Sequence, residues 1–261
     1  VGSEMCIRDR YARRDGEPIG VAEAIEYHYY PRFAGDELPP SPEATAVALA
    51  DRLDTLVGIF GIGEPPTGSK DPFALRRASL AVIRMLINLK KPLSLTGLLQ
   101  AVVEQHTADL SPDTPDVVSH YITERLGNWY DDDGINISVV RAALAAGATD
   151  LFDIDLRVRA LNAFAKTETA EHLAAANKRV ANILAKADNL DGTPADPNLF
   201  VHEAEHALHE AISRVGSTLA PLLADRNYQS ALDELAQLRG PVDAFFEGVM
   251  VNAEDPVERL N

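Results

Sequence analysis

Apolar residues recur at helical spacing along almost the whole chain, and no segment alternates apolar and polar residues as a half-buried strand does. Ala, Leu, Glu and Arg dominate the periodic segments, and short clusters of Gly, Pro and Asp separate them. The pattern predicts an all-α protein. With 261 residues, 46% of them hydrophobic, the chain is long enough for one or two packed cores.

Start and stop signals place the individual helices. Ser41 is an N-cap candidate before a proline at the first helical position, and Asp71-Pro72 repeats this arrangement. Lys90-Lys91-Pro92 ends the second of these helices, and Asp131-Asp132-Asp133-Gly134 breaks a later pair. Further helices are expected over about 94–108, 115–130, 138–146, 153–166, 169–188, 199–219, 227–239 and 241–250.

Two helical bundles are expected, with boundaries near Pro92 and near residues 147–150. This gives a first helical domain over 11–92, a helical connecting segment over 93–150 and a second bundle over 151–261. Residues 1–10 show no helical or strand period and resemble an assembly or sequencing scar, so they are set aside. They hold Cys6, the only cysteine, which excludes internal disulfides and favours a reducing cytoplasm.

The formal net charge of −16 and the pI of about 4.8 argue against nucleic-acid binding when taken alone, because phosphate contacts need Lys and Arg. Binding depends on local patches, however, and the excess carboxylates can lie on other faces. No run approaches the roughly 20 apolar residues that a membrane-spanning helix needs, so no membrane role is expected.

His202-Glu203-Ala204-Glu205-His206 matches H-E-x-x-H, the pattern that places two zinc-binding imidazoles on one helix face. His209 offers a third nitrogen one turn further on. The apolar stripe of this helix is expected at Val201, Leu208, Ile212 and Val215. Both imidazoles fall roughly 120–160° from its centre, so they should face solvent. A chance match in a surface helix is therefore favoured over a zinc protease.

Two other patterns have a functional and a plain interpretation. Asp51 and Asp54 lie three residues apart on one helix, as a metal or acid–base site needs, but a solvated helix edge is the commoner arrangement. The glycines of residues 61–68 resemble a phosphate loop only superficially. Ser69 precedes Lys70 and the flanking segments are helical, so no ATP site is expected there.

Two cationic groups are candidates for RNA contact. Lys70, Arg76 and Arg77 lie at the expected start of a helix, where anions are favoured. Lys178, Arg179, Asn182 and Lys186 are expected on the helix face opposite a stripe of Leu173, Val180, Leu184 and Ala187, and that combination suits phosphates and base edges. The alternative for the first group is that its side chains form salt bridges with nearby Asp or Glu. The alternative for the second group is a solvated helix face with no binding role.

Several blocks of sequence resemble the beta subunit family of bacterial glycyl-tRNA synthetases. The resemblance runs from about Tyr11 to the end of the chain, is weakest over 93–150 and departs most over 189–215. The blocks that carry it cover residues 30–39 (Tyr-Pro-Arg-Phe-Ala-Gly-Asp-Glu-Leu-Pro), 50–63, 67–77, 175–184, 228–232 and 242–251.

The resemblance implies an alpha2-beta2 enzyme in which the alpha subunit activates glycine with ATP and the beta subunit recognises tRNA(Gly). This chain would then hold no catalytic residue and no cofactor of its own. Its first part is similar to an HD-type helical domain, and its second to the DALR-type anticodon-binding domain of arginyl-tRNA synthetases. The family continues beyond both ends of this sequence.

Asp51 resembles the late metal-binding Asp of HD phosphohydrolases by its motif position. The upstream His and His-Asp elements of that motif would lie before this chain or under Arg10, so no metal site is assigned. The alternatives to a tRNA-binding ligase subunit are a metal-dependent HD phosphohydrolase, a zinc protease and a helical interaction module without an RNA role.

Overall fold

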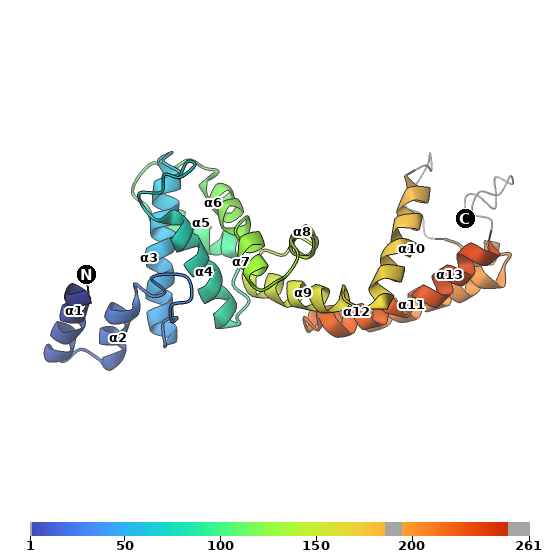
Figure 1. Ribbon diagram of the computed structural model, residues 1–261, viewed down its shortest axis with the longest axis horizontal. Coiled ribbons are helices and arrows are strands. Elements are labelled where there is room, and N and C mark those ends of the chain that lie inside the picture. The colour runs from blue at the N-terminus through green and yellow to red at the C-terminus, as the bar shows by residue number, and fades with distance from the viewer. Residues whose placement is uncertain (1, 186–194, 250–261) are drawn as a thin grey trace. The chain divides into compact units, whose positions relative to one another are not determined.

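The computed structural model describes residues 2–185 and 195–249 and is all-α, as the periodicity predicts. No strand occurs in these two ranges, where only the isolated bridges Thr67–Lys70 and Ser94–Asp150 form. The chain divides into two compact units, Val1–Asp155 and Leu156–Asn261. Figure 1 shows the helices of each unit.

Helix α3 is the centre of the first unit and contacts α2, α4, α5 and α6, with α2 and α4 on either side of it (Figure 1). Its buried face carries Ala48, Leu49, Leu53, Leu56 and Val57. The helices of this unit are α1 (Gly2–Arg14), α2 (Ile19–Tyr27), α3 (Pro42–Gly61), α4 (Leu75–Leu89), α5 (Leu95–Gln105), α6 (Thr114–Thr123), α7 (Leu126–Asp132) and α8 (Ile137–Ala145), followed by the start of α9 (Leu151–Phe164).

Several local signals act as predicted. The Ser41 hydroxyl accepts a hydrogen bond from the Ala44 amide at 3.2 Å, with Pro42 at the first helical position. The break after Asp131 is also confirmed, because Gly134 takes a φ of 71° and α8 then begins at Ile137.

Three stretches differ from the expectations. Residues 2–10 lie in α1 although their sequence shows no helical period. The helix expected over 115–130 is two helices, α6 and α7. In α7, a β-carbon at position 127 would lie only 2.4 Å from Cδ1 of Ile137, so the close packing there requires Gly127. The segment 93–150, expected to connect two bundles, packs into the first unit, because α5 and α6 both contact α3.

The second unit pairs a long helix, α11, with two shorter ones, and α10 packs on α12 and α13. Its helices after α9 are α10 (Glu168–Leu184), the short 3₁₀ turn η1 (Pro197–Leu199), α11 (Glu203–Ala224), α12 (Tyr228–Ala236) and α13 (Arg239–Gly248). The expected apolar stripes need three corrections. Leu184 of α10 and Ile212 of α11 are about half exposed, and Val201 is exposed and lies before α11 begins. Ala211 and Val215 are the buried residues of α11.

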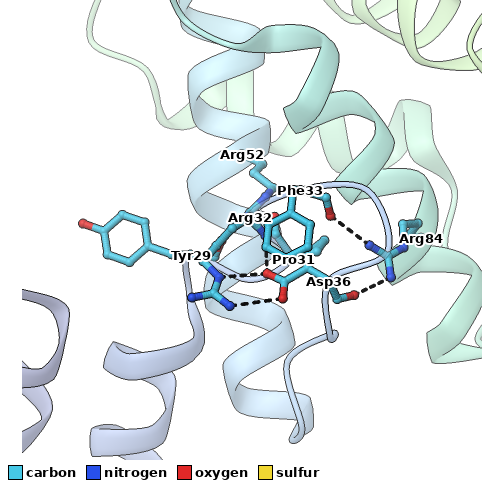
Figure 2. Close-up of polar contacts among 7 residues, drawn as sticks. All are labelled: Tyr29, Pro31, Arg32, Phe33, Asp36, Arg52 and Arg84. Atoms are coloured by element: carbon cyan, nitrogen blue, oxygen red, sulfur yellow. Dashed lines mark hydrogen bonds and ion pairs between the residues drawn. The ribbon is translucent and has the colours of Figure 1, made fainter. Parts of the chain in front are cut away.

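One buried charge ties α3 to the segment that precedes it. The Arg52 guanidinium donates to the carbonyls of His28 and Ala48 at 2.7 and 3.0 Å through Nη1. Through Nη2 it donates to Tyr29 and Pro31 at 2.8 and 3.2 Å. Burial lowers the pKa of Arg52 and the Asp51 carboxylate opposes this, but a guanidinium stays protonated at neutral pH. Four main-chain oxygens thus replace the water that would solvate the charge, and the three from residues 28–31 fix that segment against α3 (Figure 2).

We predict that Arg52→Met destabilises the first unit by roughly 2–4 kcal/mol, because buried carbonyls lose their donor while the side-chain volume is kept. Trp129 is the only tryptophan of the chain and lies in α7, so its fluorescence during urea unfolding reports on this unit. Arg77→Met removes an exposed arginine of α4 and should change stability by less than about 0.5 kcal/mol. Equal urea midpoints for wild type and Arg52→Met would contradict the anchoring role of Arg52.

Candidate nucleic-acid interface

The loop between α2 and α3 is held by an internal ion pair. The Arg32 side chain donates to the Asp36 carboxylate through Nε at 2.8 Å and through Nη2 at 3.2 Å, and the Arg32 amide donates to Oδ2 at 2.8 Å (Figure 2). The same guanidinium lies 4.3 Å from the centroid of the Tyr30 ring. Asp36 is buried, whereas the Arg32 side chain remains 46% exposed. Arg32 is therefore an exposed cation with a fixed position.

Arg84 fastens this loop to α4. Its Nη2 donates to the Asp36 carbonyl at 2.6 Å and its Nη1 to the Phe33 carbonyl at 3.4 Å, across about 50 residues of sequence (Figure 2). Since Arg52 holds the first part of the same loop on α3, two arginines from neighbouring helices position it. Five of its main-chain carbonyls accept from these two side chains, where no secondary structure supplies a partner.

The hydrogen bond from the Arg32 side chain lowers the pKa of Asp36 well below that of an ordinary carboxyl group. The amides of Arg32 and Glu37 act in the same direction, while burial opposes them. The native loop therefore favours the ionised form of Asp36.

An open groove of about 560 Å³ lies beside this loop, between residues 29–32, α3 and the start of α4. Asp51 lines it on the α3 side, next to Arg52, and Arg32 and Arg77 line it as well. Guanidinium groups raise the local positive potential and disfavour a bound divalent cation. The arginines around Asp51 thus argue against the metal chemistry that its motif position suggested.

Asp54 does not share a site with Asp51. Its Oδ1 lies 3.1 Å from Nε2 of His106, at the end of α5, whereas Asp51 lines the groove. The His106 ring also approaches Gly58, where a side-chain carbon would lie 3.2 Å from Cε1. The two carboxylates therefore have separate surroundings and do not form an acid–base pair.

The start of α4 differs from the expectation. The helix begins at Leu75, not at Asp71-Pro72, because the Asp71 carboxylate accepts from the amides of Leu75 and Arg76 at 2.8 and 3.1 Å. These amides already have an anionic partner, so the helix terminus is not an open phosphate site. Ala74 precedes the helix in the left-handed region, with a φ of 56°.

The three cations expected at that terminus are separated. Lys70 is exposed and pairs with Thr67 through the main chain, at the turn of the preceding loop. The Arg76 side chain donates to the carbonyl of Gly68. Arg77 is exposed and lines the groove instead.

Helix α10 presents part of the second cationic group to solvent. Lys178, Arg179 and Asn182 are exposed, whereas Leu173 and Val180 are half-buried on the other side. The Arg179 guanidinium lies 4.0 Å from the centroid of the Phe246 ring of α13, which fixes its orientation. Lys186 lies outside the described residues.

The H-E-x-x-H motif is not on one helix face. His202 precedes α11 as its N-cap, with extended backbone, and its amide donates to the Glu205 carboxylate at 2.7 Å. His206 and His209 instead contact the edge of Phe200, at centroid distances of 5.1 and 5.5 Å. The geometry that a zinc protease needs is therefore missing.

Over the described ranges, no three or more His, Cys, Asp or Glu side chains are grouped so that they could hold a metal ion. None of the helices in these ranges combines the length and the apolar character needed to cross a membrane.

No motif of the sequence marks Tyr29, Arg32, Arg52, Phe73 or Arg84 as functional or positioning residues. One signal was present for Arg52. It falls three residues after Leu49 and four before Leu56, in the apolar phase of α3, where a charge needs a buried partner. Phe73 and Tyr29 carried no such signal, because their exposure depends on how the loops pack.

Comparisons with known proteins find a matching family model in each of the two units. Residues 6–145 match the family model described as glycyl-tRNA synthetase beta subunit, and residues 173–261 match the DALR anticodon binding domain. The glycine–tRNA ligase beta subunits of Haemophilus influenzae (strain PittGG) and Chromohalobacter salexigens are each 49% identical over 96% of this chain. That of Pseudomonas fluorescens (strain SBW25) is 48% identical over 96%.

Both family models describe parts of proteins that handle tRNA, which places the chain among aminoacyl-tRNA synthetase components. The chain belongs to the glycyl-tRNA synthetase beta subunit family, whose model matches more than half of its residues. It spans 36–37% of the length of the curated relatives named above.

We predict that Asp36→Asn destabilises the first unit near pH 7 and that the difference from wild type narrows as the pH falls below about 4. The folded-state pKa of Asp36 is lowered, so its contribution is complete above the ordinary carboxyl pKa and is lost during acidification. Urea midpoints from Trp129 fluorescence between pH 7 and 3 measure the difference. Asp132→Asn, at an exposed carboxylate, is the matched control. A difference for Asp36→Asn that stays constant over this range would contradict the pairing.

Proposed function

We propose that this chain is the tRNA-recognising part of a glycine–tRNA ligase beta subunit and that it acts in the cytoplasm. The alpha subunit of an alpha2-beta2 enzyme would perform the ATP-dependent activation of glycine and its transfer to tRNA(Gly). This chain would bind tRNA(Gly) and contribute no catalytic residue. In this proposal the first unit is the HD-like domain and the second is the anticodon-binding domain.

The exposed face of α10 is the observation that carries this proposal. Lys178, Arg179 and Asn182 project to solvent from a helix that lies largely within the range matched by the anticodon-binding family. Two cations and an amide one turn apart can contact a phosphate and a base edge together. The stacking of Arg179 on Phe246 holds one of these groups in place before any ligand arrives.

The local charge along α10 supports the same role. Its first turn carries Glu168 and Glu171, and its cations follow two turns later. The acidic and basic parts of the helix are thus separated, and an RNA strand can reach the basic part alone. The net charge of −16 then limits non-specific RNA binding, because carboxylates elsewhere repel duplexes that dock in other positions.

The phosphohydrolase alternative receives less support from the site. Its one candidate ligand, Asp51, lies among arginines, and Asp54 is paired with His106. An interaction module without an RNA role would not need an exposed cationic face on α10, and the tRNA experiment below separates that alternative.

We predict that Lys178→Ala with Arg179→Ala weakens tRNA(Gly) binding by the complete alpha–beta enzyme and flattens its salt dependence. Each lost phosphate contact should reduce the log–log slope by about 0.9 for duplex and about 0.7 for single-stranded RNA. Filter binding or fluorescence anisotropy between 50 and 300 mM salt measures affinity and slope.

Lys91→Ala with Lys166→Ala removes the same charge from two other exposed positions and should leave the slope unchanged. Because Arg179 packs on Phe246, the single variant Lys178→Ala and a circular dichroism spectrum test whether folding is affected. Wild-type affinity and slope in a folded double variant would show that this face is only solvated.

A further inference from the structure

The groove beside Asp51 differs in charge from the rest of this acidic protein. The cations Arg32, Arg52 and Arg77 line it together with the single carboxylate of Asp51. Arg8 of α1 also lines it. The local excess of guanidinium groups favours an anionic ligand.

Two of these arginines are available to a ligand. Arg77 is exposed on the first turn of α4, and no ion pair or hydrogen bond of its side chain is found within the described residues. Arg32 uses Nε and Nη2 on Asp36 and rests on the Tyr30 ring. Its position is thus set in advance, so binding costs little side-chain entropy.

Aromatic rings line the same groove. Phe73 is 52% exposed and Tyr29 is 39% exposed, and both are groove residues. In Figure 2 the Tyr29 ring points away from the arginine cluster that holds its main chain. Exposed aromatic side chains beside cations are typical of surfaces on which unpaired bases stack while their phosphates are neutralised.

We propose that this groove binds unpaired nucleotides of an RNA, with a base stacked on Phe73 and phosphates at Arg77 and Arg32. The proposal rests on the tRNA-binding function above and deepens it, because it adds a second RNA contact on the other unit of the chain. Asp51 then accepts a hydrogen bond from a ribose 2′-hydroxyl, which distinguishes RNA from DNA. Its carboxylate also keeps phosphates to the arginine-lined part of the groove.

The test uses the complete alpha–beta enzyme with a full-length beta subunit, so that every unit is in its natural setting. Phe73→Leu keeps an apolar side chain but removes the ring, and Arg77→Gln removes one charge. The double variant Phe73→Leu with Arg77→Gln should lower tRNA(Gly) affinity by roughly 5- to 150-fold from the lost base stack, with a further loss from the phosphate contact. Phe73→Tyr keeps the stacking surface and should bind like wild type.

Ile62→Ala with Lys91→Ala is the matched control, because both residues are exposed in the same unit and neither lines the groove. Ultraviolet cross-linking of the wild-type enzyme to tRNA, followed by mass spectrometry, should attach the Phe73 peptide to an unpaired nucleotide. The variant that carries both Phe73→Leu and Arg77→Gln, called the groove variant, should lose that cross-link. A DNA oligonucleotide of the same sequence as the cross-linked segment should bind more weakly than the RNA.

Two results would overturn the proposal while leaving the tRNA function intact. In one, tRNA affinity depends on Lys178 but is the same for wild type and the groove variant. In the other, the groove variant loses binding of AMP alone and keeps full tRNA affinity, which would make the groove a mononucleotide site. If neither the α10 double variant nor the groove variant differs from wild type in tRNA affinity, the proposed function itself is refuted.

Discussion

The first unit depends on the buried guanidinium of Arg52, whose hydrogen-bond acceptors are main-chain carbonyls and not carboxylates. Moving a guanidinium out of water is costly unless its donors are satisfied, and Arg52 satisfies them with carbonyl oxygens from residues 28–31 and from Ala48. Carbonyls belong to the main chain, so their positions determine the path of the backbone. The same interaction therefore stabilises the buried charge and sets the conformation of the loop before α3.

The properties of the loop's surface follow from this anchoring. Arg84 holds its second half on α4, and the Arg32–Asp36 pair closes it internally. With its backbone fixed from two helices, the loop holds Tyr29 and Arg32, which line the groove, in one arrangement. Rigid support of exposed groups reduces the entropy lost on binding, and Arg52 and Arg84 supply that support to the ligand contacts proposed above.

The sequence predicted those features that depend on neighbours along the chain. Helical periodicity, the Ser41 cap and the break after Asp131 are local, and each was correct. The start of α4 was misplaced because Asp71 caps the helix from four and five residues away. The groove could not be predicted, since its walls join residues 29–32 to residues 73–78 through packing that no local pattern encodes. The family resemblance marked the same blocks, but it could not say which side chains are exposed.

The surplus of carboxylates constrains how such a protein can hold RNA at all. At physiological salt, charges more than about 8 Å apart in solvent are largely screened, so Lys178 or Arg77 responds mainly to its immediate surroundings. Each described cationic surface is small: α10 exposes two cations, and in the groove Arg32 is partly neutralised by Asp36. A few phosphate contacts supply little affinity by themselves. At the RNA contacts proposed for these two surfaces, stacking and base contacts to unpaired nucleotides would therefore have to add to the phosphate contacts. An acidic chain with exposed aromatic rings beside isolated arginines is therefore suited to reading RNA loops and single strands, and poorly suited to binding duplexes through their backbone.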